Sequence, residues 1–133
     1  MEQFQVRTRA KIDLLDITSE VQAALGRLDL SDGLACLWVP HTTAGLVVNE
    51  NADPDVCHDL ALLMHDVSER GLPMRHAEGN SPAHFLSSLT GPSVTFLVEN
   101  RRLCLGTWQG IFLAEYDGPR TRQCWLKALD SQR

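Results

Sequence analysis

The C-terminal third of the chain constrains the fold most, because short apolar segments follow one another there with very short connections. Strand-like runs occupy residues 93–98, 103–105, 110–115 and 122–129. The segments between them hold turn-forming residues, as in Asp117-Gly118-Pro119. Connections this short cannot carry a crossover, so these strands must pair antiparallel with their neighbours.

The rest of the chain mixes helix and strand signals. Strands are predicted at 3–9, 34–39 and 46–48, the second as a buried strand. Helices are predicted at about 18–28, from Asp53-Pro54 to Gly71, and at 81–90 after Asn80, with caps and prolines at their starts. We therefore expect one compact α+β domain over residues 1–133, with a mostly antiparallel or mixed sheet and about three short helices.

Size and composition exclude several classes of protein. A chain of 133 residues with 44% hydrophobic residues can build one core but not two domains. The net charge of −5 argues against non-specific nucleic-acid binding. No apolar run approaches the roughly 20 residues that span a bilayer, and the N-terminus lacks signal-peptide features. We expect a cytoplasmic protein without membrane or nucleic-acid partners.

The four cysteines have no C-x-x-C spacing, and they lie among apolar neighbours. We therefore expect reduced, buried thiols at all four positions. They are Cys36, Cys57, Cys104 and Cys124.

Three histidines lie in polar motifs beside predicted turns. His41 belongs to Pro-His-Thr-Thr-Ala-Gly, and His76 and His84 bound the stretch His-Ala-Glu-Gly-Asn-Ser-Pro-Ala-His. Imidazole is a common metal ligand and a proton carrier near neutral pH. The other two, His58 and His65, fall on the polar face of a predicted helix and are interpreted as solvated surface. For each of the first three, the alternative is a hydrogen-bonded loop residue.

The second motif combines two kinds of metal ligand. Glu78 beside His76 offers a carboxylate and an imidazole, which both suit a divalent metal. His84 falls in the first turn of a predicted helix, where backbone N–H groups favour an anion and a neutral imidazole. These residues predict a site for metal, for an anion, or for both.

Other polar residues could hold a phosphate without a dedicated loop. Hydroxyl and amide groups are available at Thr42, Thr43, Thr107 and Gln109. Arg120 and Arg122 could add guanidinium contacts, although solvation at a strand edge is the alternative for both. Trp108 is interpreted either as a pocket wall or as a core residue.

These motifs resemble the YjbQ family, also described as secondary thiamine-phosphate synthases. The matching stretches run in family order and are 41–45, 49–54, 76–84, 91–93, 105–111 and 115–120. The resemblance implies an α+β homotrimer whose polar pocket holds the histidines and a metal such as zinc. It adds Asn49 and Asn51 to the substrate-binding candidates. It also implies weak synthase activity, which joins a pyrimidine diphosphate to a thiazole phosphate and releases pyrophosphate.

Three functions remain open on these grounds. In the first, an enzyme of diphosphate chemistry uses His41, His76 and His84 to bind Zn²⁺ or Mg²⁺, while Arg120 and Thr43 hold a phosphorylated substrate. In that reading His41, Glu78 and His84 are the catalytic candidates. The second is a metal-dependent hydrolase with Glu78 as base. The third is a non-enzymatic binder of metal or a small ligand.

Overall fold

A computed structural model describes residues 1–131, which form eight strands and three helices. The predicted α+β class with three helices is confirmed. The elements are, in chain order, β1 (Glu2–Arg7), β2 (Asp13–Asp16), α1 (Thr18–Arg27), β3 (Gly33–Trp38), β4 (Ala44–Glu50), α2 (Pro54–Ser68), α3 (Ser81–Thr90), β5 (Ser93–Glu99), β6 (Arg102–Leu103), β7 (Gln109–Glu115) and β8 (Thr121–Asp130).

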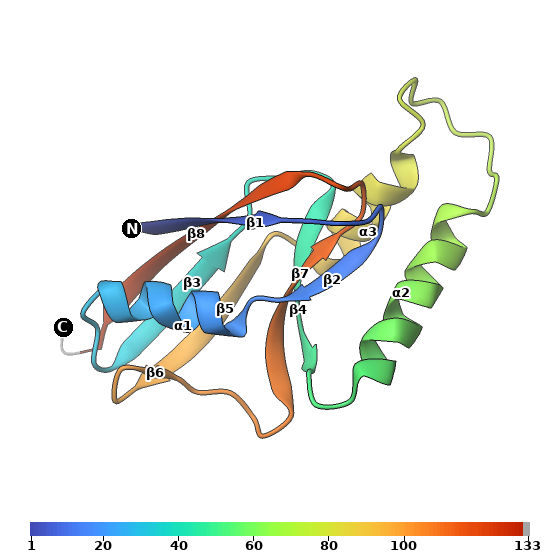
Figure 1. Cartoon of the computed structure of the whole chain (residues 1–133). Coiled ribbons are helices and arrows are strands. Elements are labelled where there is room, and N and C mark those ends of the chain that lie inside the picture. The colour runs from blue at the N-terminus through green and yellow to red at the C-terminus, as the bar shows by residue number, and fades with distance from the viewer. Residues whose placement is uncertain (132–133) are drawn as a thin grey trace.

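The strands form two sheets (Figure 1). One has five strands in the order β1-β8-β3-β5-β6, and the other has three in the order β2-β7-β4. Every strand pairing within residues 1–131 is antiparallel. Among the C-terminal strands, however, only β5 and β6 pair with each other, and the predicted pairing of residues 110–115 with 122–129 is wrong, because β7 and β8 belong to different sheets. The β7–β8 connection passes from one sheet to the other, so Glu115 and Arg122 lie where the two sheets meet.

The main core lies between the two sheets and α1. β7 is the central strand of the smaller sheet, and six of its seven residues are buried. Ile111 and Leu113 face the main core, while Ala114 and Tyr116 face α3 in a second, smaller core. Period-two alternation along this one strand therefore serves both cores.

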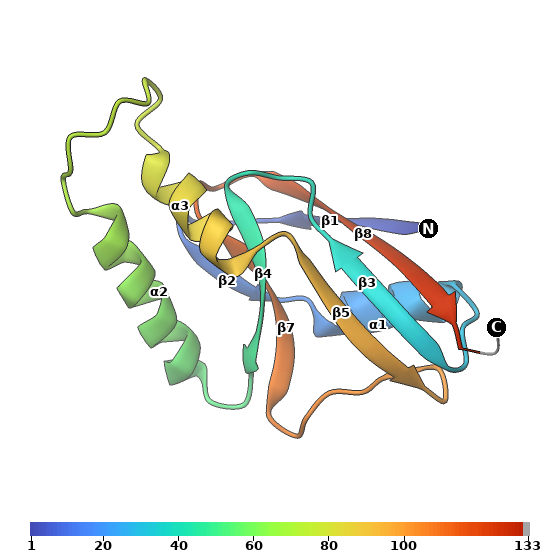
Figure 2. The same cartoon turned by 180° about the vertical axis from the view of Figure 1, so that it is seen from behind.

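α2 begins where its sequence predicts. Asp53 caps it by accepting a hydrogen bond from the Asp55 N–H at 2.9 Å, and Pro54 opens its first turn. Yet α2 has no buried residue, and Leu63, on its predicted apolar face, is 64% exposed. Figures 1 and 2 show α2 and the segment that follows it standing apart from the sheets. No helix among residues 1–131 is long and apolar enough to cross a membrane.

The outer face of the five-stranded sheet is apolar and open. The prediction of a fully buried strand at 34–39 is wrong, because β3 alternates and turns Leu34 and Trp38 outward. Leu34 pairs with Leu97 on one side and with Leu129 on the other, and all three are exposed. They form a row of leucines across three strands.

The expectation for the cysteines holds only in part. Cys124 is buried on the inner face of β8, and burial raises the pKa of its thiol to about 12. Cys36 lies on the outer face of β3 and is exposed, as is Cys104. Cys57 is half-buried, and no cysteine among the described residues forms a disulfide. For Cys36, apolar sequence neighbours fail to predict burial because alternate residues of a strand face opposite sides.

Candidate functional site

The predicted site residues fall into two groups at opposite ends of the β4–β7 pair. In the register of these strands, Ala44 lies opposite Glu115 and Glu50 lies opposite Gln109. Six residue steps of strand separate the two ends by roughly 20 Å. One end holds the histidine motifs and Arg120. The other end holds Asn49, Asn51, Thr107 and Gln109.

His76 and His84 lie side by side. Their ring centroids are 5.4 Å apart and the rings meet edge to face, at 85°. His84 projects half-buried from the first turn of α3, and His76 comes from the exposed segment before that helix. Two imidazoles on one tetrahedral zinc ion place their centroids about 5 Å apart, given Zn–N bonds of about 2.0–2.1 Å. The spacing of this pair therefore fits a shared metal.

His41 does not complete a metal centre with this pair in a single copy of the chain. Residues 1–131 contain no group of three His, Cys, Asp or Glu side chains placed to hold a metal ion. The backbone N–H of Gln123 donates to Nε2 of His41 at 2.8 Å. Since Nε2 is the acceptor, the proton of the neutral ring resides on Nδ1. In this arrangement His41 presents a hydrogen-bond donor rather than a lone pair for a metal.

The surroundings of His41 favour its neutral form. Burial, and then the positive charge of Arg122, hold the pKa of His41 below its usual value, while Glu115 acts in the opposite direction. A ring that is neutral at pH 7 keeps its Nδ1–H as a fixed donor.

A buried ion pair underlies this end of the site. Arg122 is 4% exposed and donates through Nε to Oε1 of Glu115 at 2.8 Å and through Nη2 to Oε2. Glu115 also accepts from the Thr8 hydroxyl at 2.8 Å. Although burial alone would raise it, these hydrogen bonds lower the pKa of the Glu115 carboxyl. The interpretations of Arg122 as a substrate contact or a solvated strand edge are therefore both wrong.

Thr43 belongs to the same buried network. Nη2 of Arg122 donates to the Thr43 carbonyl at 3.0 Å and to its Oγ1 at 2.9 Å. Thr43 is only 7% exposed, whereas its neighbour Thr42 is exposed. Of the two threonines, only Thr42 faces the surface.

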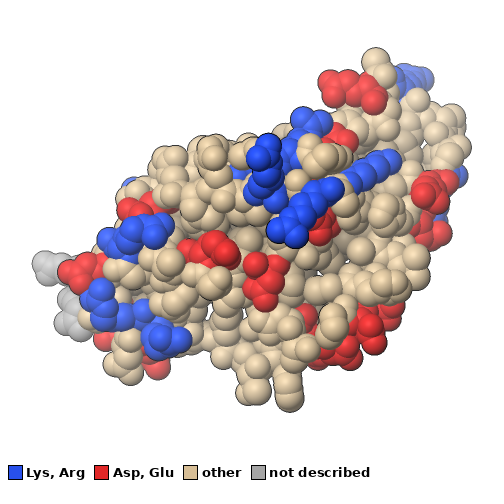
Figure 3. All heavy atoms as spheres, in the orientation of Figure 1, with Lys and Arg blue, Asp and Glu red and all other residues tan. Residues whose placement is uncertain are grey.

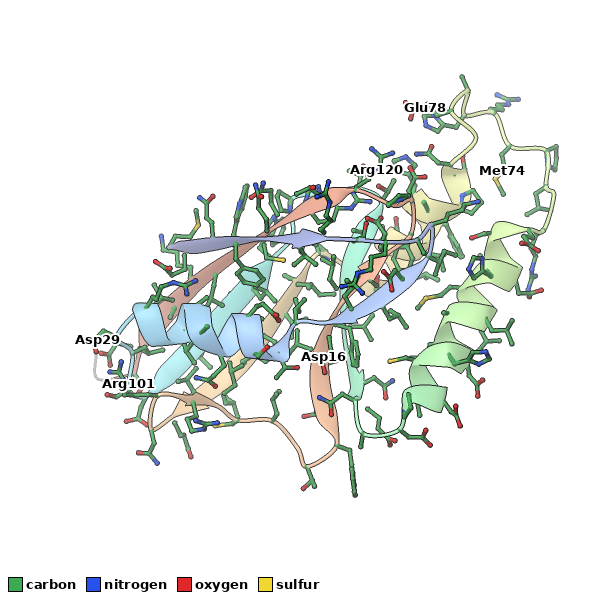
Figure 4. The ribbon with its side chains drawn as sticks, in the orientation of Figure 1. Asp16, Asp29, Met74, Glu78, Arg101 and Arg120 are labelled. Atoms are coloured by element: carbon green, nitrogen blue, oxygen red, sulfur yellow. The ribbon has the colours of Figure 1, made fainter. Side chains whose placement is uncertain are left out.

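Asp117 connects Arg120 to the start of α3. Nδ2 of Asn80 donates to Oδ2 of Asp117 at 2.9 Å, and Nη2 of Arg120 donates to the same oxygen at 3.0 Å. Nε of Arg120 also donates to the Asp117 carbonyl, at 2.7 Å. Burial opposes it, but the hydrogen bonds from Asn80 and Arg120 lower the pKa of Asp117. Figure 4 shows Arg120 and Glu78 at the same edge of the molecule.

The segment that pairs with Arg120 through its backbone carries three exposed cations. Thr8, whose backbone N–H donates to the Arg120 carbonyl at 2.8 Å, lies between Arg7 and Arg9, and Lys11 follows. The last three are exposed and form no ion pair within the described part of the chain. Figure 3 shows lysine and arginine side chains gathered on this face, despite the net charge of −5. These side chains add positive charge beside the Arg120–Asp117 ion pair.

The second group forms a separate polar surface. Nδ2 of Asn51 donates to Asp16 at 3.1 Å, and Oε1 of Gln109 accepts from the Gly106 N–H at 2.8 Å. Asn49 and Thr107 are exposed, and Trp108 is 63% exposed. Trp108 is therefore not a core residue. All of these side chains lie at the other end of the β4–β7 pair from the histidines.

Comparison with known proteins identifies the family to which this fold belongs. The family model described as UPF0047 protein YjbQ-like matches residues 2–131. The chain belongs to the YjbQ family. Among its relatives, the UPF0047 protein YugU of Bacillus subtilis is 47% identical over 97% of this chain and 98% of its own length. A UPF0047 protein of Methanocaldococcus jannaschii is 44% identical over 95% of this chain and 91% of its own length.

Solved structures of the YjbQ family show the same fold. An uncharacterised YjbQ/UPF0047 protein of Clostridium acetobutylicum matches with a TM-score of 0.92 and 42% identity, covering 97% of this chain and 100% of the other. A conserved hypothetical protein of Thermus thermophilus matches with a TM-score of 0.88 and 45% identity, with the same coverage. Family membership therefore establishes the fold, whereas the names of these relatives state no activity.

Proposed function

We propose that this YjbQ-family chain is a small-molecule enzyme that binds a phosphate or diphosphate substrate at the histidine end of β4 and β7. The hydrogen-bonded link from Asn80 through Asp117 to Arg120 carries the proposal. It holds a guanidinium beside the first turn of α3, which bears His84. Guanidinium groups bind phosphate oxygens through paired N–H donors, and helix starts favour anions.

The chemistry follows from where these groups lie. Arg120 and the unpaired cations near it stabilise the negative charge that grows on a departing diphosphate. His41 supplies a neutral Nδ1–H donor, because Nε2 already accepts from the backbone. His84 and Glu78 are the candidates for proton transfer. These roles agree with the synthase reaction that the family resemblance implies, in which pyrophosphate leaves.

The donor set fits a divalent cation in part. His76 and His84 would supply two nitrogen ligands for Zn²⁺, and phosphate oxygens of the substrate could complete the set for Zn²⁺ or Mg²⁺. Such an ion would neutralise phosphate charge. His41 is outside this set, because its Nε2 already accepts a hydrogen bond from the Gln123 N–H.

We further propose that the protein is a cytoplasmic homotrimer. The row formed by Leu34, Leu97 and Leu129 and the uncovered α2 are apolar surfaces that association would bury. A neighbouring copy could also bring its Asn51 and Gln109 group to the histidine end. Light scattering should give three times the mass of 14.8 kDa, and Leu34→Asp should reduce it to the monomer mass. A parent protein that is monomeric at micromolar concentration would contradict the trimer.

The activity is tested by pyrophosphate release from the pyrimidine diphosphate in the presence of the thiazole phosphate, with metal analysis of the same sample. His84→Ala should lose the activity, while His58→Ala, on the exposed polar face of α2, should keep it. No release by the parent protein, with or without added Zn²⁺ or Mg²⁺, would reject the synthase assignment.

A hydrolase is the second candidate. Two histidine ligands leave coordination positions open for water, and Glu78 lies between them in sequence. Phosphate release from the thiazole phosphate alone would favour it. Binding of both phosphorylated compounds without turnover would instead favour a non-enzymatic binder.

A further inference from the structure

Thr8 is a buried polar residue between β1 and β2, and its hydroxyl joins two parts of the site. It is 3% exposed, and its Oγ1 donates to Oε1 of Glu115 at 2.8 Å and accepts from the backbone N–H of Arg120 at 2.7 Å. The Arg120 carbonyl lies 3.0 Å from the same hydroxyl, but a hydroxyl has one hydrogen, and the charged carboxylate is the stronger acceptor. The hydroxyl therefore points its hydrogen toward Glu115 and a lone pair toward the N–H of Arg120.

Backbone contacts fasten the loop between β7 and β8 to the segment between β1 and β2. The Thr8 N–H donates to the Arg120 carbonyl at 2.8 Å, and the Gly118 N–H donates to the Lys11 carbonyl at 3.0 Å. A Cβ on Gly118 would lie 2.2 Å from the carbonyl oxygen of Ala10 and 3.0 Å from Oγ1 of Thr8. Glycine at this position lets the two backbones approach this closely. The loop that carries Arg120 is therefore held at two points along its length.

Glu115 reaches Arg120 by two routes. Its Oε1 accepts from Thr8, which in turn accepts from the Arg120 N–H. Its Oε2 accepts from the backbone N–H of Asp117 at 3.0 Å, and the carbonyl and carboxylate of Asp117 accept from the Arg120 side chain. Glu115 is fully buried and cannot contact a ligand itself, whereas Arg120 is exposed. The buried carboxylate therefore acts on the surface through the residues that it holds.

We propose that Thr8 is a positioning residue, which holds Arg120 in the conformation that binds phosphate oxygens. Thr8 fixes the backbone of Arg120, Asp117 fixes its guanidinium, and Glu115 joins the two. A side chain that is ordered before binding loses less conformational entropy when the ligand arrives. The identity of the ligand rests on the proposed function, whereas the positioning rests on hydrogen bonds within one chain. A hydroxyl needed only for stability would change unfolding and leave the affinity unaltered.

Thr8→Val tests the role of the hydroxyl, because valine has nearly the shape of threonine but no Oγ1. It leaves the Arg120 N–H without its acceptor, and the dissociation constant for inorganic pyrophosphate should rise roughly five- to tenfold. Thr8→Ser keeps Oγ1 and should bind within about twofold of the parent.

The matched control is Thr90→Val, at the far end of α3. The Thr90 hydroxyl accepts from the Tyr116 hydroxyl at 3.1 Å and donates to the Leu86 carbonyl at 3.1 Å. This change also removes a hydroxyl that both accepts and donates, so it should lower the melting temperature while keeping the parent's affinity for pyrophosphate.

A second readout needs no ligand, so that the positioning and the proposed phosphate site fail separately. The Nε–H of Arg120 donates to the Asp117 carbonyl at 2.7 Å, and its ¹⁵N NMR signal reports how firmly the side chain is held. We expect this signal to shift and broaden in Thr8→Val and to stay as in the parent in Thr8→Ser and Thr90→Val. In the parent itself, the backbone amide of Arg120 should exchange with solvent more slowly than an unbonded loop amide, a measurement that does not depend on the folding of Thr8→Val.

The proposal would be overturned if Thr8→Val kept the parent's pyrophosphate affinity or its Arg120 Nε–H signal. Losses of the same size in Thr8→Ser or Thr90→Val, or an Arg120 amide that exchanges as fast as an unbonded one, would also overturn it. A parent that does not bind pyrophosphate, but whose Arg120 signal depends on the Thr8 hydroxyl, would reject the phosphate site and still support the positioning of Arg120.

Discussion

The backbone N–H of Gln123 donates to Nε2 of His41 across 82 residues of sequence. This bond assigns the tautomer of the neutral ring, because Nε2 is already an acceptor. His76 and His84 lie together and can share a cation, whereas His41 presents an N–H donor. One end of the molecule thus holds an imidazole N–H donor and a pair of adjacent imidazoles.

The lowered pKa of His41 makes stability depend on pH in a defined window. The unfolded chain takes up a proton near pH 6.5, before the folded chain does, so the contribution is complete above about pH 6.5 and is lost as the pH falls below it. The lowered carboxyl pKa values of Glu115 and Asp117 act only at more acidic pH. Urea unfolding between pH 5 and 7.5 should show less pH dependence in His41→Gln than in the parent. An identical slope in both proteins would show that His41 is protonated equally in both states.

Breaking the buried ion pair should be costly. Glu115→Gln leaves the Arg122 guanidinium buried without a counter-charge, and we expect a loss of about 3 kcal/mol in the free energy of unfolding. The double variant Glu115→Leu with Arg122→Met removes both charges and should lose less than the single change. Chemical denaturation measures the free energy of unfolding of both variants. A Glu115→Gln value within about 0.5 kcal/mol of the parent would mean that the ion pair contributes little to stability.

The glycine of the first histidine motif is required by close packing. A Cβ on Gly45 would lie 2.2 Å from Oγ1 of Thr90 and 3.0 Å from the Gly91 carbonyl oxygen. Gly45→Ala should therefore lose about 1–3 kcal/mol of unfolding free energy. Gly26 in α1 has no atom within 4 Å of an added Cβ, and Gly26→Ala should gain about 0.5–1 kcal/mol. Thermal unfolding of the two variants should move in opposite directions, and a shift of both in the same direction would refute the packing argument.

His84 should be a site residue rather than a core residue. Its ring is half-buried and contacts His76, so His84→Ala should change stability by no more than about 1 kcal/mol. Affinity for Zn²⁺ should fall at least tenfold, since one of two ligands is removed. Calorimetric titration and thermal unfolding are measured on the same preparation. Unchanged affinity with a large drop in melting temperature would assign His84 a structural role.

Local signals predicted much of this fold. The Asp53-Pro54 start of α2 and the proline after Ser81 in α3 lie where the sequence places them, because caps and prolines act within one turn of helix. His76 and His84 lie close together in sequence, and their contact in the structure is short-range. The burial of Arg122 and the bond from Gln123 to His41 were not predictable, because both depend on how β8 lies against residues far away in sequence. The Asn80–Asp117 bond is equally nonlocal, whereas Asp117 and Arg120 lie only three residues apart.

Titration of inorganic pyrophosphate into the metal-free protein, and again with Mg²⁺ present, tests most directly whether Arg120 marks a phosphate site. The matched variants are Arg120→Gln and Arg27→Gln, the second of which removes an exposed arginine that pairs with Glu2 on another face. The parent and Arg27→Gln should bind with the same affinity, and Arg120→Gln should bind at least tenfold more weakly. If Arg120→Gln bound pyrophosphate as tightly as the parent, or if the parent did not bind it at millimolar concentration, the phosphate site would be rejected.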